Sequence, residues 1–285
     1  MRNGERIAKR PRVLRRPVLA ASALLVVYLG LLPVSRLGPA TARVGVLAPE
    51  AANSASPEMA DAPAVPGGVS FVGTPAVGAL FTTTAAGGLG SHFCTASVVD
   101  SPGHDLVMTA AHCVSATTPD RIAFVPEYHS GQTPYGIWGV ERIIVNQAWT
   151  SSADPNDDFA FLVIDRSRSG KNVQDVTRGE LLATGVPPGQ LVRVIGYPEG
   201  EDSPISCENV ALSFSPTQLE FSCGGYTDGT SGGPWLVDVS PSTGLGRLIG
   251  VVGGYEQGGY TPSVSYAATF GASVAALYKS AIAAS

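Results

Sequence analysis

The sequence predicts an all-β fold: two antiparallel six-stranded β-barrels followed by a C-terminal helix. Two features of the chain lead to this prediction. Twelve short, strand-like runs follow one another between residues 77 and 269, and turn-forming Gly, Pro, Asp or Ser bound most of them. The 285 residues also include 34 Gly and 22 Pro, which is typical of a protein made of strands and turns.

Each run is short and rich in Val, Ile, Leu, Phe or Thr, the residues that strands favour. The runs are, in order, 77–83, 92–99, 106–111, 121–128, 138–146, 159–165, 191–198, 210–215, 219–223, 234–239, 247–254 and 263–269. Twelve strands are the number that two six-stranded barrels need. After them, Val274, Leu277, Tyr278 and Ile282 recur at helical spacing and predict the C-terminal helix.

Residues 1–42 are predicted to be a secretory signal peptide. A basic stretch precedes an uncharged, largely apolar run from Val18 to Ser35, and Ala40 and Ala42 then form an A-x-A cleavage pattern. The alternative is an uncleaved membrane anchor, because the apolar run is close to the lower limit of roughly 17 residues for a spanning helix. The cleavage pattern favours the signal peptide, so we expect a secreted protein that meets a membrane only if this segment stays uncleaved.

Residues 43–70 are predicted to be a linker or pro-segment, since they are rich in Ala, Pro and Ser and contain no aromatic residue. Residues 71–285 then form the folded domain. From residue 44 onward, nine Lys and Arg stand against 22 Asp and Glu, a formal charge of −13. A nucleic-acid-binding face needs clustered basic residues, so we expect no nucleic-acid partner. We expect a monomer.

Four cysteines follow the predicted signal peptide: Cys94, Cys113, Cys207 and Cys223. An even number in an exported chain indicates two disulfides, for which three pairings are possible. We favour the local pairs Cys94–Cys113 and Cys207–Cys223. The alternative is a zinc site made by His92, Cys94, His112 and Cys113, but no C-x-x-C or H-x-x-x-H spacing supports it. We therefore predict neither a metal nor a cofactor.

The segment GTSGGPW, residues 229–235, places Ser231 among glycines. Acyl transfer by serine needs a base for the hydroxyl proton, a carboxylate that orients the base, and N–H donors for the oxyanion. Gly229 and Gly232 allow backbone conformations closed to other residues, so a substrate carbonyl could reach the N–H groups of Gly229 and Ser231. Taken alone, the segment is also typical of a Gly-rich turn.

Of the four histidines, His112 is the best candidate for the base. An apolar strand leads into it and a cysteine that a disulfide can fix follows it, which is how a rigid scaffold presents a side chain. We expect His104 to be solvated in a turn, His129 to lie in a polar loop and His92 to be half-exposed at the start of a strand.

Asp158 is the candidate for the orienting carboxylate. It directly precedes an apolar strand that can shield it, whereas Asp157 is expected to be solvated or turn-forming. The three candidates follow the order His112, Asp158, Ser231. The nucleophile elbow of α/β-hydrolases needs a histidine after the serine, and none follows His129. The subtilisin order needs an aspartate first, and no strand-linked aspartate precedes His112.

Three segments resemble the signature blocks of the chymotrypsin/trypsin-like serine protease family: TAAHC (109–113), DFAFLVI (158–164) and GTSGGPW (229–235). HFCTASVV resembles the strand whose cysteine bridges to the one after the catalytic histidine, which implies a Cys94–Cys113 disulfide. The resemblance covers about Val77 to Ser285. It is closer to secreted bacterial, glutamyl endopeptidase-like members than to trypsin.

The resemblance implies a double β-barrel with the active site in the cleft between the barrels, and an endopeptidase that acts on proteins or peptides. It implies His112 as the general base, Asp158 as its orienter and Ser231 as the nucleophile, with the N–H groups of Gly229 and Ser231 as the oxyanion hole. Two alternatives remain: a catalytically silent binding or adhesion protein on the same fold, and an esterase that uses the same triad.

One departure from the family pattern concerns activation. Thr230 stands where trypsin-like members carry the aspartate that pairs with a new N-terminal ammonium. The matching region TPAVGALF also lacks a basic activation cleavage site. We therefore expect an oxyanion hole held by local packing and hydrogen bonds.

A second departure concerns specificity. Gly225 stands where trypsin-like enzymes carry the aspartate that selects Lys or Arg, so a basic preference is not supported. Thr227 or the segment VVGGYEQGG is expected to line the specificity pocket. Within that segment, Val252, Gly253 and Gly254 are candidates for substrate binding, because an extended substrate could add as a strand beside them.

Overall fold

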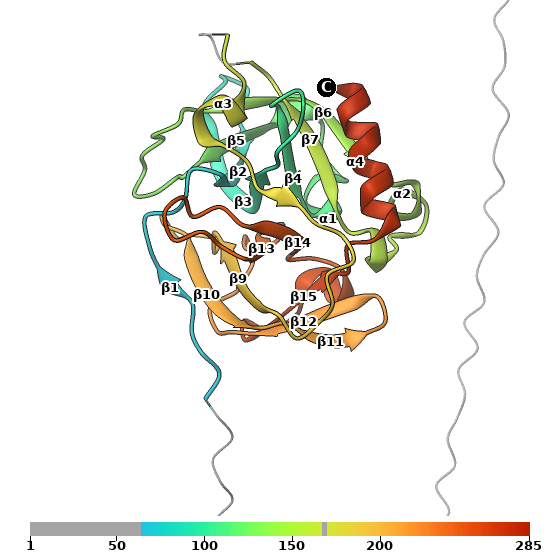
Figure 1. Cartoon of the computed structure of the whole chain (residues 1–285). Coiled ribbons are helices and arrows are strands. Elements are labelled where there is room, and N and C mark those ends of the chain that lie inside the picture. Colours follow the sequence, from blue (N-terminus) through green and yellow to red (C-terminus); the bar gives the residue numbers. More distant parts are fainter. Residues whose placement is uncertain (1–63, 167–169) are drawn as a thin grey trace, which may run out of the picture. The chain divides into compact units, whose positions relative to one another are not determined.

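The computed structural model of the protein describes residues 64–166 and 170–285 (Figure 1). The predicted signal peptide, residues 1–42, and most of the predicted linker lie outside the described residues. Within the described part of the chain, no helix is both long enough and apolar enough to cross a membrane.

The described residues form fifteen strands, four α-helices and three 3-10 helices. The strands are β1 (Val69–Ser70), β2 (Val77–Thr83), β3 (Leu89–Val98), β4 (Leu106–Thr109), β5 (Ile122–Pro126), β6 (Trp138–Val145), β7 (Ala160–Ile164), β8 (Leu181–Leu182), β9 (Leu191–Gly196), β10 (Ile205–Val210), β11 (Leu212–Ser215), β12 (Gln218–Ser222), β13 (Pro234–Val237), β14 (Arg247–Val251) and β15 (Val264–Ala268). The helices are α1 (Ala111–Val114), α2 (Gln147–Ser152), α3 (Val173–Thr177), α4 (Ala272–Ala284), η1 (Pro119–Arg121), η2 (Pro155–Asp157) and η3 (Tyr255–Gly258).

The first half of the domain is a closed antiparallel barrel with the strand order β2-β3-β4-β7-β6-β5 (Figure 1). Both faces of β4, β5 and β7, and of most of β2, are buried. On β2, Leu80 packs within the first half, whereas the next residue, Phe81, belongs to a core cluster shared with the second half and α4. The double burial explains why these strands are continuous apolar runs in the sequence and do not alternate with polar residues.

The second half contains a six-stranded sheet, β1-β10-β9-β13-β14-β8, and a three-stranded sheet, β11-β12-β15. The fold class predicted from the sequence is confirmed, but the second half has two sheets where one closed ladder was expected. Several contacts join them, among them a disulfide and a close approach of two strands. The Cys207–Cys223 disulfide links β10 to the end of β12, and Gly250 lies so close to β15 that a Cβ on it would be 2.9 Å from the Cβ of Ala267.

The predicted C-terminal helix is α4, which packs against β6 and β7 of the first barrel (Figure 1). Its buried residues are Val274, Leu277 and Ala281, at helical spacing. Tyr278 is partly buried and its hydroxyl donates to the carbonyl of Asp100 at 2.6 Å. The end of the chain therefore returns to the half of the domain that the chain forms first.

Three strands lie outside the predicted runs. β10 (ISCENV) lacks the apolar pattern of a buried strand, and all its residues except Cys207 are exposed or partly exposed. β8 is two residues long and pairs in parallel with β14. β1 lies inside the predicted linker: Val69 and Ser70 pair with β10, so the end of the linker belongs to the folded domain.

Candidate active site

A cleft of about 870 Å³ is lined by residues of both halves of the domain. From the first half come His112 and the disulfide cysteines Cys94 and Cys113. From the second half come the residues around Ser231, including Gly229. The two predicted centres, the histidine and the serine, therefore meet in one cavity although they are far apart in the chain.

His112 reaches the cleft from α1, a four-residue helix that follows the fully buried strand β4. Its ring Nδ1 lies 2.8 Å from Oδ2 of Asp158, and its backbone N–H donates to Oδ1 of the same carboxylate at 2.9 Å. The carboxylate thus fixes both the backbone and the ring of His112. With Nδ1 held by Asp158, Nε2 is the ring nitrogen left for a substrate or a nucleophile.

Asp158 lies between η2 and β7, and its side chain is fully buried. A buried carboxylate is costly unless hydrogen bonds stabilise its charge. Three donors do so here: the two groups of His112 and the backbone N–H of Gly254, 2.9 Å from Oδ2. Gly254 belongs to the second half, so Asp158 also joins the two halves at the cleft.

Asp157 has a different place, and the expectation that it is solvated or turn-forming was only partly right. It ends η2, but it is buried. Asn146 donates to its Oδ1 at 2.7 Å, and the hydroxyl of Ser273 at the start of α4 donates to the same oxygen. Asp157 therefore anchors the C-terminal helix.

Ser231 lies between two glycines whose conformation other residues would strain. Gly229 has φ +87° and Gly232 has φ +79°. A Cβ on Gly229 would lie 2.5 Å from the carbonyl oxygen of Tyr197, and one on Gly232 would lie 2.1 Å from Oγ1 of Thr109. The glycines are required by close packing as well as by backbone conformation.

The backbone of this loop is oriented by hydrogen bonds to its carbonyl groups. The carbonyl of Asp228 accepts from the N–H of Glu199 at 2.6 Å, and that of Thr230 accepts from Gly233 at 2.9 Å. In a trans peptide the N–H points opposite to the C=O. These two bonds therefore direct the N–H groups of Gly229 and Ser231 to the other side of the loop. Neither N–H has an acceptor among residues 64–166 and 170–285.

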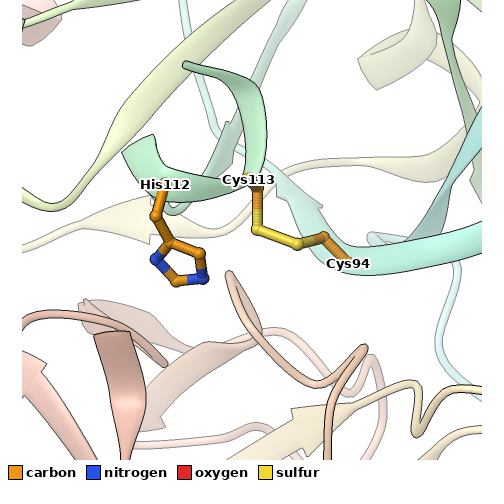
Figure 2. Close-up of side chains that lie close together, drawn as sticks. All are labelled: Cys94, His112 and Cys113. Carbon is orange, nitrogen blue, oxygen red and sulfur yellow. A yellow bond between two sulfur atoms is a disulfide. The ribbon is translucent and has the colours of Figure 1, made fainter. Parts of the chain in front are cut away.

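The two disulfides predicted from the sequence are present: Cys94–Cys113 and Cys207–Cys223. Figure 2 shows the first of them beside His112, bridging α1 to β3. The sulfur atoms and a ring nitrogen of His112 lie within 4.8 Å of one another. Because both sulfurs are in a disulfide, they are not thiolate ligands, and the alternative zinc site lacks two of its four proposed ligands.

The other histidines lie away from this arrangement. The side chain of His104 is 48% exposed and pairs with Asp175 at 2.7 Å, as expected for a surface turn. Nδ1 of His129 lies 2.8 Å from the carbonyl of Glu127 in a loop. The expectation for His92 was wrong: it is buried, with Nε2 3.0 Å from the carbonyl of Glu201.

Of the candidate substrate-binding residues, Thr227 and Val252 line the cleft, whereas Gly225, Gly253 and Gly254 are not part of its lining. The N–H of Val252 donates to Gly233, that of Gly253 to Tyr266 and that of Gly254 to Asp158. Among the carbonyl groups of residues 252–254, only that of Gly253 accepts no hydrogen bond from the described residues.

The cleft carries carboxylates on its lining. Glu199, Asp228 and Glu256 lie there, and the described lining residues include no Lys or Arg. Tyr226 also lines the cleft. Its hydroxyl donates to the carbonyl of Val194 at 2.7 Å, and burial raises the pKa of this hydroxyl, so Tyr226 stays neutral. We expect the carboxylates of the lining to disfavour acidic substrate side chains.

A closed six-stranded barrel joined to a second β half, with a cleft lined by both, is the architecture of chymotrypsin-like serine proteases. The model of the trypsin family matches residues 71–270, and the chain belongs to this family. Comparison with curated proteins gave no significant match.

Solved structures of bacterial proteases are similar to the chain. Protease Anisep from Arthrobacter nicotinovorans shares 26% identity, with a TM-score of 0.63 over 75% of this chain and 98% of its own. The thermostable serine protease AL20, from an extremophilic microorganism, also shares 26% identity and a TM-score of 0.63, over 74% of this chain and 99% of its own. A Glu endopeptidase has the same fold at 15% identity, with a TM-score of 0.58 over 76% of this chain and 97% of its own.

Proposed function

We propose that this protein is a secreted serine endopeptidase that hydrolyses peptide bonds through an acyl-enzyme. His112 is the general base, Asp158 orients it, and Ser231 is the nucleophile. The observation that carries the proposal is the His112–Asp158 pair in the same cleft as Ser231. The two unbonded N–H groups of Gly229 and Ser231 on this loop supply the oxyanion hole.

The reaction follows from these positions. Nε2 of His112 takes the hydroxyl proton as Oγ of Ser231 forms a bond to the carbonyl carbon of the peptide. The carbonyl oxygen becomes an oxyanion held by the N–H groups of Gly229 and Ser231. His112 then returns the proton to the leaving amine as the C–N bond breaks. Water repeats the sequence on the ester and releases the acid and Ser231.

Activation in this enzyme does not use the pairing of an ammonium with an aspartate. Thr230 is buried and its hydroxyl donates to the carbonyl of Thr227 at 2.7 Å. A Cβ on Gly196 would be 2.7 Å from the Cβ of Thr230, so this site is closely packed. A neutral, internally bonded side chain in a closely packed site has no charge to offer an N-terminal ammonium.

The substrates are proteins or peptides. A bound peptide can donate an N–H to the carbonyl of Gly253. The other backbone N–H and C=O groups of residues 252–254 are already hydrogen-bonded, so strand addition along this stretch is limited to that one bond. The enzyme acts as a monomer outside the cell, where its two disulfides are stable. It uses no metal or cofactor, because the side chains and N–H groups described here suffice for acyl transfer.

The test is Ser231→Ala, compared with Ser213→Ala, an exposed serine on β11. Ser231→Ala should abolish labelling by a fluorophosphonate probe and lower kcat on labelled casein by about six powers of ten, whereas Ser213→Ala should change neither. His112→Ala should have a similar effect, and the double variant should be little worse, because the triad acts as a unit.

Other outcomes identify the alternatives. A folded, processed protein that no fluorophosphonate labels would be the silent binding protein. A labelled protein that cleaves simple esters but neither casein nor a peptide library would be the esterase. Additive losses in the double variant would count against the shared role of Ser231 and His112.

A further inference from the structure

Thr95 connects the first barrel to the nucleophile loop. It follows Cys94 in β3 and is fully buried, so neither its hydroxyl nor its backbone contacts solvent. It lies 134 residues from Gly229 in the chain, and the fold brings the two together.

The hydroxyl of Thr95 makes two hydrogen bonds. It donates to the carbonyl of Gly229 at 2.9 Å and accepts from the N–H of Tyr197 at 2.8 Å. A hydroxyl has one proton to donate. Here it is donated to the Gly229 carbonyl, while an oxygen lone pair accepts the N–H of Tyr197. The same residue donates its backbone N–H to the carbonyl of Ser231 at 2.7 Å.

These bonds act on two peptide groups: the one between the two free N–H groups and the one that follows Ser231. The Gly229 carbonyl belongs to the peptide that lies between the N–H groups of Gly229 and Ser231. Holding this carbonyl fixes the rotation of the middle peptide, and holding the Ser231 carbonyl fixes the peptide that follows Ser231. Through Tyr197, the hydroxyl also holds the segment whose Glu199 N–H bonds to the carbonyl of Asp228.

Thr95 is itself held in place. The hydroxyl of Thr109, on the neighbouring strand β4, donates to the carbonyl of Thr95 at 2.8 Å. The disulfide of the preceding residue, Cys94, ties this point of β3 to the residue after His112. Thr95 is therefore held firmly on the His112 side of the cleft, and the nucleophile loop is hydrogen-bonded to it.

We propose that the hydroxyl of Thr95 is a positioning group that holds the nucleophile loop with the N–H groups of Gly229 and Ser231 toward the reacting carbonyl. This inference rests on the proposed serine protease function. It assigns to an uncharged hydroxyl, supplied by the other half of the domain, the task of keeping the oxyanion hole formed where Thr230 provides no charge.

The test compares Thr95→Val, which keeps the shape and removes the hydroxyl, with Thr95→Ser, which keeps the hydroxyl. Thr95→Val should lower kcat on labelled casein, and the rate of fluorophosphonate labelling, by about tenfold to a hundredfold, with KM changed by less than about threefold. Thr95→Ser should stay within about threefold of the wild type in all three quantities. The matched control is Thr177→Val, which removes another buried hydroxyl, bonded to Val173 in α3.

The comparison separates positioning from stability. Thr177→Val should lower the melting temperature about as much as Thr95→Val but leave kcat unchanged. If Thr95→Val keeps its kcat, or if Thr177→Val loses as much, the inference is wrong. Thr95→Ala replaces Thr95→Val if the valine variant does not fold, with the same expected result. Failure of the proposed function looks different: the wild type itself would then show no Ser231-dependent labelling.

Discussion

The three hydrogen bonds to Asp158 restrict what can replace it. Its two oxygens accept from the ring and the backbone of His112 and from the N–H of Gly254. An asparagine has only one oxygen for these three donors, and its NH₂ group must face at least one of them. The buried site has no solvent to relieve this conflict, since the Asp158 side chain is fully buried.

We therefore expect Asp158→Asn to fold but to lower kcat by about four powers of ten, because the ring of His112 is no longer held with Nε2 free to accept a proton. Steady-state kinetics on labelled casein measure this loss. Asp157→Asn is the control: it touches α4 and not His112, so it should lower the melting temperature and leave kcat within about threefold. Equal losses of kcat in the two variants would contradict the assignment.

At the scale of elements, β1 and the residues just before it support the segment that leads to Ser231. The N–H of Gly68 donates to the carbonyl of Gly224, and the N–H of Gly224 donates to the carbonyl of Pro66, both at 2.7 Å. The next two residues, Val69 and Ser70, pair with β10. Gly224 leads directly into the segment that lines the cleft, so residues 66–70 hold one end of this segment in place.

Removing this support should weaken the enzyme. A chain shortened to residues 71–285 should lose on the order of 2 kcal/mol of stability and about tenfold in kcat/KM, because the bonds to Gly224 and β10 are lost. Chains that begin at residue 64 or a few residues earlier should be equally active, since activation needs no particular N-terminal ammonium. Thermal melts and casein hydrolysis of the three forms measure this. Activity confined to one unique terminus would overturn the account given for Thr230.

The sequence predicted the elements whose residues act locally. Each of the twelve predicted runs contains an observed strand, and the apolar signal is strongest where both faces are buried, as in β4, β5 and β7. The candidates His112, Asp158 and Ser231 were chosen because each lies in a distinctive segment and because their order along the chain excludes two other folds. The structure adds the contacts between His112 and Asp158.

The remainder depends on contacts between distant parts of the chain. Thr95 looks like an ordinary strand residue, since nothing near it in the sequence indicates Gly229 or Tyr197. β1 was assigned to the linker because two residues among Pro and Gly carry no strand pattern. His92 and Asp157 were expected near solvent because polar residues usually lie there, and tertiary packing buries both.

At the scale of the whole molecule, Glu180 lies where the chain passes between the two halves. Its backbone bonds to Val98 and Asp100 of the first half, and its Oε2 accepts from the N–H of Gly246 in the second at 2.6 Å. Its Oε1 has no partner among the described residues. Burial raises the pKa of Glu180 from 4.5 to about 7, and the bond from Gly246 lowers it by less.

This raised pKa makes stability depend on pH. The folded state holds the proton of Glu180 more tightly than the unfolded state, so its contribution is fully present below about pH 4.5 and is lost as the pH rises to about 7. The loss is on the order of 3 kcal/mol. Glu180→Gln stays neutral at every pH, so its stability relative to the wild type should increase across this window. Urea unfolding at about pH 5 and pH 8 measures the difference; a constant difference would contradict the assignment.

The return of α4 to the first barrel has a consequence for when the domain can be completed during synthesis. The ribosome makes the barrel of His112 and Asp158 first, the loop of Ser231 and Gly254 much later, and α4 last. Until α4 has been made, the first barrel lacks the helix that packs against β6 and β7. A chain that ends before α4 therefore leaves apolar residues of β6 and β7 uncovered, among them Phe161, whose ring lies 5.6 Å from that of Tyr278. We expect such a chain to be less stable than the full domain.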